Sequence, residues 1–219
     1  MGLFDKKFCS VCGEKIGFLG NRKLEDGNLC KNCASKLSPM FDDRRHSTVE
    51  DIKKQLAYRE ENEKQLESFE VTRTFGEETL ICLDEKQHKF VIAHTNDIHS
   101  ENPDIIDYNQ VTSCELDIYK NRVEEKKADK EGKMVSYNPP RFRNDYEFNQ
   151  KFRVNSPWFD EFEVRLNKNT VRVYETVSSG LFFDQANSVY NNEDKGVECR
   201  KYETMGKDIK EAIMNNRYE

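Results

Sequence analysis

The stretch Lys7-Phe8-Cys9-Ser10-Val11-Cys12-Gly13 and the later stretch Cys30-Lys31-Asn32-Cys33 decide how this chain begins to fold. Each contains a Cys-x-x-Cys pair, which makes a tight turn that directs two sulfur atoms toward one point, and seventeen residues separate the pairs. Gly13 can supply the left-handed backbone of such a turn. Four thiolates at this spacing favour a tetrahedral, closed zinc site. We therefore predict one structural Zn²⁺ on four ligands: Cys9, Cys12, Cys30 and Cys33.

Other uses of the cysteines fit the sequence less well. A disulfide framework needs an oxidising compartment, and residues 1–7 contain no apolar run of the kind found in a signal peptide. The total of seven cysteines is odd, which does not suit complete pairing. Iron binding or a redox role stays an alternative to zinc. We interpret Cys82 and Cys114 as small core residues, because both lie in strand-like apolar runs.

Residues 1–46 form the predicted metal-binding module. The segment is too short to build a sufficient apolar core, so metal binding would supply folding free energy. A short helix after Cys33, ended by Pro39, gives the order knuckle, hairpin, helix, which is typical of a treble-clef-like or ribbon-like module. Nine basic and six acidic residues give the segment +3, and four thiolates with Zn²⁺ reduce this to +1. The charge therefore does not indicate a DNA-reading finger.

Residues 47–68 are predicted to form a linker helix. Ser47 and Glu50 have the spacing of a capping box. Apolar residues follow one helix face at both ends, whereas residues 59–64 are almost entirely charged. We therefore expect a spacer, Thr48–Ser68, that packs at its ends and is exposed at its centre.

Residues 69–219 read as a β domain with a C-terminal helix. Strand-like segments recur from Phe69, and two hairpins are expected, one across 84–88 and one across 167–169. An amphipathic helix over about 194–216 carries the stripe Tyr202, Met205, Ile209, Ala212 and Ile213. The fold class is therefore α+β: an antiparallel barrel or sandwich, one end or edge of which the helix covers.

Two stretches of the β domain lack strand signals. Residues 120–143 are strongly charged and end at Pro139-Pro140, which predicts a mobile insertion between strands. The second stretch, 178–192, contains Leu181-Phe182-Phe183, a candidate interaction point. Either the insertion or this apolar triplet could supply a binding surface.

The cysteine stretches, together with Asp26-Gly27-Asn28-Leu29 and the helix that begins near Ser47, resemble a bacterial family of unknown function. Members of that family start with a four-cysteine zinc-ribbon-like domain, and in many a pleckstrin-homology-like domain follows. The resemblance is residue by residue over about the first 70 positions and is one of pattern beyond them. It implies zinc binding and this order of modules, and it implies no established activity.

No nucleotide-binding or hydrolase motif occurs in the chain. The segment His94-Thr95-Asn96-Asp97-Ile98-His99 offers two histidines and a carboxylate, so a metal-dependent enzyme is one alternative. However, His94 and His99 would lie on opposite faces of a strand. A second alternative is a peripheral binder of anionic lipids, through six basic residues: Lys86, Lys89, Lys120, Arg122, Arg141 and Arg143.

Composition favours a third function. The formal net charge of −6 argues against general nucleic-acid binding, and no apolar stretch approaches membrane-spanning length. We therefore predict a cytoplasmic, non-enzymatic zinc protein that recognises a protein or peptide partner through its pleckstrin-homology-like domain, with no catalytic residue.

Overall fold

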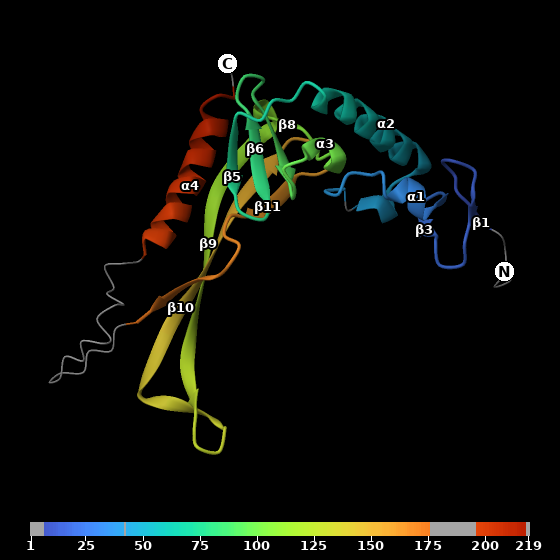
Figure 1. The fold of residues 1–219 in the computed structure, drawn as a ribbon. Helices are drawn as coiled ribbons and strands as arrows, with labels where there is room; N and C mark the ends of the chain where they lie inside the picture. The colour runs from blue at the N-terminus through green and yellow to red at the C-terminus, as the bar shows by residue number, and fades with distance from the viewer. Residues whose placement is uncertain (1–6, 42, 176–195, 218–219) are drawn as a thin grey trace.

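The computed structural model describes residues 7–41, 43–175 and 196–217 (Figure 1). The Leu181-Phe182-Phe183 triplet lies outside these ranges. The four-cysteine module, residues 7–46, contains two short hairpins, β1 (Lys7–Phe8) with β2 (Lys15–Ile16) and β3 (Arg22–Lys23) with β4 (Asn28–Leu29). Helix α1 (Lys31–Ala34) and the 3₁₀ turn η1 (Asp43–His46) complete it. The predicted order of knuckle, hairpin and short helix is present.

Helix α2 (Val49–Leu66) follows the module directly. Thr48 is its N-cap, and Thr48 and Asp51 form the capping box, so the predicted Ser47–Glu50 pair is wrong by one residue. The prediction of an exposed helix centre is also wrong. Gln55, Arg59 and Asn62 are buried, because the helix lies between the module and the β domain (Figure 1).

A buried set of polar side chains, which we call the polar interlock, joins α2 to both neighbours. The interlock consists of Ser38, Gln55, Arg59, Asn62 and Asp104. Arg59 Nη1 lies 2.7 Å from Asp104 Oδ1, and the Ser38 hydroxyl donates to Asp104 Oδ2 at 2.6 Å. Asn62 accepts from the N–H of Ile105 and donates to the carbonyl of Pro103, both at 2.8 Å. Most of the buried polar atoms of the interlock are hydrogen-bonded, although Gln55 Nε2 and Arg59 Nε have no partner among the described residues, so these contacts favour one way of docking the module.

An aromatic contact adds to this junction. Trp158, from the β domain, packs edge-on against Phe41 of the module at 6.0 Å between ring centroids. It also contacts Tyr58 of α2 at 6.1 Å. Trp158 thus joins all three parts of the chain.

The β domain is built from two antiparallel sheets. The first has the order β5 (Arg73–Gly76), β6 (Leu80–Asp84), β7 (Lys89–Ala93) and β8 (Ile106–Asp107), with α3 (Ile98–Glu101) between β7 and β8. The 3₁₀ turn η2 (Tyr108–Gln110) leads into the second sheet. There β10 (Met134–Val154) pairs with β9 (Val111–Ala128) on one side and with β11 (Glu161–Arg165) and β12 (Val171–Tyr174) on the other.

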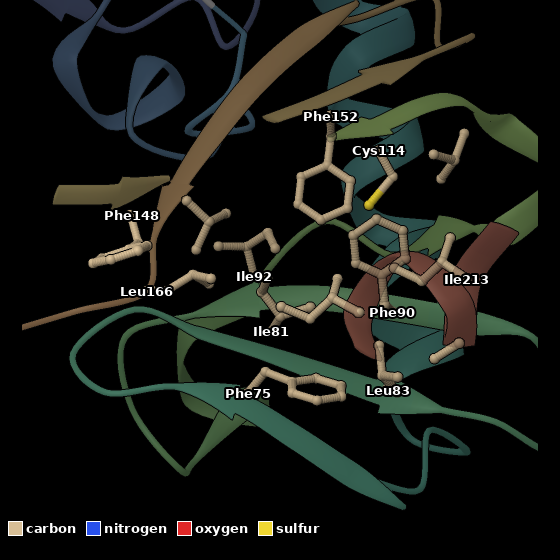
Figure 2. Close-up of a cluster of buried hydrophobic side chains, with 14 of the residues drawn as sticks. Phe75, Ile81, Leu83, Phe90, Ile92, Cys114, Phe148, Phe152, Leu166 and Ile213 are labelled. Carbon is tan, nitrogen blue, oxygen red and sulfur yellow. The ribbon is translucent and has the colours of Figure 1, made fainter. Parts of the chain in front are cut away.

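The main core lies between the two sheets and helix α4 (Val197–Met214). Figure 2 shows Phe90 of the first sheet close to Phe152 of the second, and their ring centroids are 5.3 Å apart. Ile213 of α4 joins the same cluster. No hydrogen-bonded strand pair connects the two sheets within the described residues. The fold is therefore α+β with an open two-sheet sandwich, and the closed-barrel form of the prediction is wrong.

The charged stretch 120–143 is not an irregular insertion, as we predicted. Residues up to Ala128 continue β9, and β10 resumes at Met134, so the two strands form one long hairpin that projects beyond the core (Figure 1). We call residues 119–143 the ribbon. The ribbon does not need a core, because cross-strand hydrogen bonds and side-chain pairs hold most of its residues in register, with an irregularity between Ser136 and Arg141. Low hydrophobicity therefore misled the sequence prediction.

The predicted hairpin across Asn167-Lys168-Asn169 is also wrong. Both β11 and β12 run antiparallel to β10, so they are one interrupted edge rather than two paired strands. Asn167 explains the interruption. Its Oδ1 accepts the Phe148 N–H at 2.8 Å, and its Nδ2 donates to the Asn169 carbonyl at 2.8 Å. The buried amide thus replaces backbone partners where the edge loops out.

Candidate metal centre

The first Cys-x-x-Cys pair lies in a knuckle between β1 and β2. The Cys9 N–H donates to the Glu14 carbonyl at 2.8 Å, and the Gly13 N–H donates to the Cys9 carbonyl at 2.9 Å. Gly13 has φ +75°, the left-handed conformation expected from its place in the sequence. These bonds fix the turn that directs Cys9 and Cys12 to one side.

The second pair opens helix α1. Cys30 is the N-cap of this helix, and the Cys33 N–H donates to Cys30 Sγ at 3.3 Å. The Cys30 N–H donates in turn to Cys9 Sγ at 3.4 Å. The backbone donor aimed at Cys9 Sγ favours the thiolate form of Cys9, which is the form that binds a metal.

The two pairs are held together by backbone contacts. The Ser10 N–H donates to the Asn28 carbonyl at 2.7 Å, which ties the knuckle to the second hairpin. Gly27 permits this approach, because a Cβ there would lie 2.6 Å from Val49 Cγ2 and 2.7 Å from Ser10 Oγ. A buried cluster of side chains surrounds the site: Ile16, Leu24, Leu29, Leu37 and Ile52.

All four sulfur atoms converge. They lie within 4.8 Å of one another, and Cys12 Sγ is 3.7 Å from Cys30 Sγ. Bonds of about 2.3 Å to a tetrahedral ion place sulfur atoms about 3.8 Å apart, whereas a disulfide requires about 2.05 Å. The cysteines are free thiols at distances that suit a metal ion. Cys9, Cys30 and Cys33 are buried, and Cys12 lies at the surface.

The pKa shifts of the clustered thiols also favour a bound cation. Burial alone raises the pKa of the Cys9 thiol, but backbone N–H groups, chiefly that of Cys12, lower it to about 6. Burial and the neighbouring sulfurs of Cys12, Cys30 and Cys9 raise the pKa of Cys33. A second thiolate beside the first is therefore unfavourable unless a cation neutralises both. The four thiols fit a metal ion.

The histidine segment does not assemble into a second site of this kind. His94 Nδ1 lies 2.7 Å from Glu101 Oε1, and Glu101 Oε2 accepts the backbone N–H of His94. Glu101 thus closes the turn before α3. Across the described ranges, the cysteines form the only group of three or more His, Cys, Asp or Glu side chains that converge.

The six basic residues of the lipid alternative do not gather on one surface. Lys86 lies in the β6–β7 turn and Lys89 begins β7, whereas the other four lie on the ribbon. Three have carboxylate partners: Lys86 with Glu70 at 2.7 Å, Arg122 with Glu175 at 2.7 Å and Arg143 with Asp145 at 2.8 Å. No helix among the described residues is long and apolar enough to cross a membrane.

Comparison with known families bears on the N-terminal part of the chain. Residues 7–55 match the family model of a domain of unknown function (DUF4428). The matched range contains all four cysteines and the first turns of α2, so the expected resemblance to a four-cysteine family of unknown function is confirmed there. Searches of the curated proteins and of the solved structures found no match.

Proposed function

We propose that the four cysteines bind one Zn²⁺ ion whose role is structural. Four sulfur ligands complete a tetrahedron, so no position is left for a water or a substrate. Zinc suits this set because it tolerates thiolates and has no geometric preference of its own, although iron shares the affinity for four sulfurs. The convergence of the sulfurs carries this proposal.

Metal analysis of the purified chain tests the proposal. We expect one zinc per chain, and we expect Cys30→Ala to abolish stoichiometric binding. Cys82→Ala is a matched control, because Cys82 is equally buried but lies outside the cluster. Iron in place of zinc, or a folded module that retains no metal, would contradict the proposal.

We further propose that residues 69–217 are a pleckstrin-homology-like binding domain without enzymatic activity, and that its ligand is a peptide segment of a protein. Two facts support this. The antiparallel strands of two sheets are followed by a C-terminal helix packed on them, and strands followed by such a helix are the pattern that the family resemblance implies. In addition, β9 pairs with β10 and with no other strand in the part of the chain that the structure describes, so its outer edge offers backbone groups to an added strand.

The ribbon determines which peptide would suit this edge. It carries eight basic and four acidic residues, a formal +4 in a chain of −6. Aromatic rings lie beneath several cations: Arg122 is 3.6 Å from the Phe142 ring, and Arg141 is 4.5 Å from the Tyr137 ring. This surface is complementary to an acidic peptide that adds a strand along β9.

A displayed peptide library can test this function. We would select binders on the full chain and compare them on a variant in which residues 126–140 are replaced by an Asn-Gly turn, which can close a hairpin between Glu125 and Arg141. We expect acidic peptides whose affinity falls about 10-fold or more on the shortened ribbon. Equal affinity for both proteins, or no enrichment on the full chain, would contradict the proposal.

A further inference from the structure

The turn Gly17-Phe18-Leu19-Gly20, which we call the apolar tip, is unlike the rest of the surface. The Gly20 N–H donates to the Gly17 carbonyl at 3.0 Å, so Phe18 and Leu19 occupy the two central positions of a β-turn. Such positions usually hold Gly, Pro, Asn, Asp or Ser. Here two large apolar side chains are 85% and 84% exposed, more than any other large apolar residue described. Among residues 7–41, 43–175 and 196–217, Phe18 and Leu19 are not part of any buried cluster.

The apolar tip stands on a fixed base. Ile16, just before it, is buried in the core around the metal centre. Just after it, Asn21 Nδ2 donates to Asn28 Oδ1 at 2.9 Å. Phe8, which lies opposite Lys15 in the first hairpin, adds a further apolar side chain that is 55% exposed. The module therefore holds the tip out from its surface rather than folding it inward.

Positive charge surrounds the base of the tip. Residues 15–24 contain Lys15, Arg22 and Lys23 and no acidic residue. Across the described residues, no carboxylate lies within ion-pair distance of these three cations. Arg44 Nη1 donates to the Lys23 carbonyl at 2.9 Å, which brings a further cation alongside. Burial, and then the nearby charges of Arg22 and Arg45, lower the pKa of Arg44, so the cations are crowded.

We propose that the apolar tip inserts Phe18 and Leu19 into the interface of an anionic lipid bilayer, while Lys15, Arg22 and Lys23 contact the lipid phosphates. Apolar groups at the apex with cations behind them match the order of acyl chains and head groups in a bilayer. A protein partner fits less well, because two side chains bury far less than the roughly 800 Å² per partner of a standard interface. This surface is distinct from the ribbon and from the lipid set predicted from the sequence.

Vesicle cosedimentation of the full, zinc-loaded chain tests the proposal. We expect binding to phosphatidylcholine vesicles that contain roughly 30% phosphatidylglycerol, about 10-fold weaker binding to pure phosphatidylcholine, and loss of binding at high salt. The proposal would be overturned if the wild-type protein did not bind the anionic vesicles, or if it bound both kinds of vesicle equally.

Variants distinguish insertion of Phe18 and Leu19 from non-specific binding of the protein to vesicles. Phe18→Ser/Leu19→Ser should weaken binding about 10-fold or more, since each side chain loses its burial in the interface. Met134→Ser, an exposed apolar control on the ribbon, should leave binding unchanged. Lys15→Gln/Lys23→Gln should reduce binding to anionic vesicles alone, whereas Lys53→Gln/Lys54→Gln on exposed α2 positions should not. Unchanged metal content confirms that each variant is folded.

Two further results decide between a bilayer and a protein pocket. In a Phe18→Trp variant, brominated acyl chains should quench the new fluorescence beyond the level seen for Trp158 in the wild type. Absence of this quenching overturns insertion. A second result would also overturn insertion. In it, the wild-type chain does not bind vesicles but captures a soluble protein, and the Phe18→Ser/Leu19→Ser variant no longer captures that protein. Such a result would mean that the tip binds a protein pocket.

Discussion

Helices α2 and α4 are both 18 residues long, and both bury one face, but the middle of that face is polar in α2 and mostly apolar in α4. The inward face of α4 is mostly apolar and includes Tyr202, Ile209 and Ile213. The inward residues of α2 recur at alternating intervals of three and four: Ile52, Gln55, Arg59, Asn62 and Leu66. In both helices the buried residues recur with the helical period. The comparison therefore shows that a buried helix face can consist largely of polar residues when the neighbouring elements supply hydrogen-bond partners.

Removal of the metal should produce the largest difference in stability between the two helices. The N-terminal part of α2 packs on the metal module through Ile52, whereas α4 packs on the core of the β domain through Ile209 and Ile213. Chelation, or Cys30→Ala, should remove on the order of 10 kcal/mol from the module. Hydrogen exchange should then show lost protection near Ile52 and retained protection near Ile209. Equal loss in both helices would show that the module and the β domain fold as one unit.

The next largest effect should come from Asp104→Ala in the interlock. This change leaves the buried Arg59 guanidinium without its carboxylate, and breaking such a pair costs about 3–5 kcal/mol. Denaturant unfolding measures the loss. The double variant Arg59→Met/Asp104→Leu should recover much of it, because an apolar pair of similar size needs no partner. A double variant as unstable as the single one would mean that the polar contacts, rather than the unpaired charge, determine stability.

On α4 the corresponding change is Ile209→Ala, which leaves a cavity in the apolar core. We expect a loss of about 2–5 kcal/mol in the free energy of unfolding, since Ile209 is fully buried. Lys207→Ala, at an exposed position of the same helix, should change it by less than about 0.5 kcal/mol. Similar results for the two variants would contradict the packing of this face.

The smallest effect concerns the ion pair that ties α4 to the β5–β6 turn. Glu77 Oε1 accepts from Lys201 Nζ and from the Tyr202 hydroxyl, both at 2.7 Å. The Lys201 bond, followed by the Lys168 N–H, lowers the pKa of Glu77 from 4.5 to about 2. Because the folded pKa is depressed, this stabilisation is complete above pH 4.5 and is lost as the pH falls toward 2.

We expect the lost stabilisation to be roughly 1–2 kcal/mol, after allowance for solvent screening. Thermal unfolding of the wild type and of Glu77→Gln, followed from pH 6 to about pH 2.5, measures it. The stability difference between the two proteins should shrink across this range. A constant difference would show that the carboxylate contributes nothing through its charge.

The parts that could be predicted from the sequence share one physical property: they depend on local spacing. The interval within Cys9–Cys12 and the interval within Cys30–Cys33 each direct two sulfur atoms to one side of a turn, and this spacing predicted the cluster that the structure shows. The apolar stripe of α4 and the β6–β7 hairpin likewise depend on neighbours a few residues away. Such features can be predicted from the sequence because the geometry of a turn or a helix places their side chains.

The parts that could not be predicted depend on distant partners. Arg59 reads as a solvated charge until Asp104, 45 residues away, lies beside it. The charged segment 120–128 reads as a loop until residues 134–146 pair with it. Asn167 reads as a turn residue until its amide meets the backbone of Phe148. In each case the residue's own chemistry is ambiguous, and a long-range hydrogen bond decides it.

The sequence by itself determined the four-sulfur cluster, the two long helices and the α+β class, because these follow from periodicity and ligand spacing. Only the tertiary structure decided that α2 is a buried junction, that the β domain is an open sandwich with a projecting ribbon, and that Phe18 and Leu19 lie outside the three cores of the described residues. Burial is a property of the assembled chain. The same polar or apolar side chain can therefore lie inside or outside until its distant neighbours are in place.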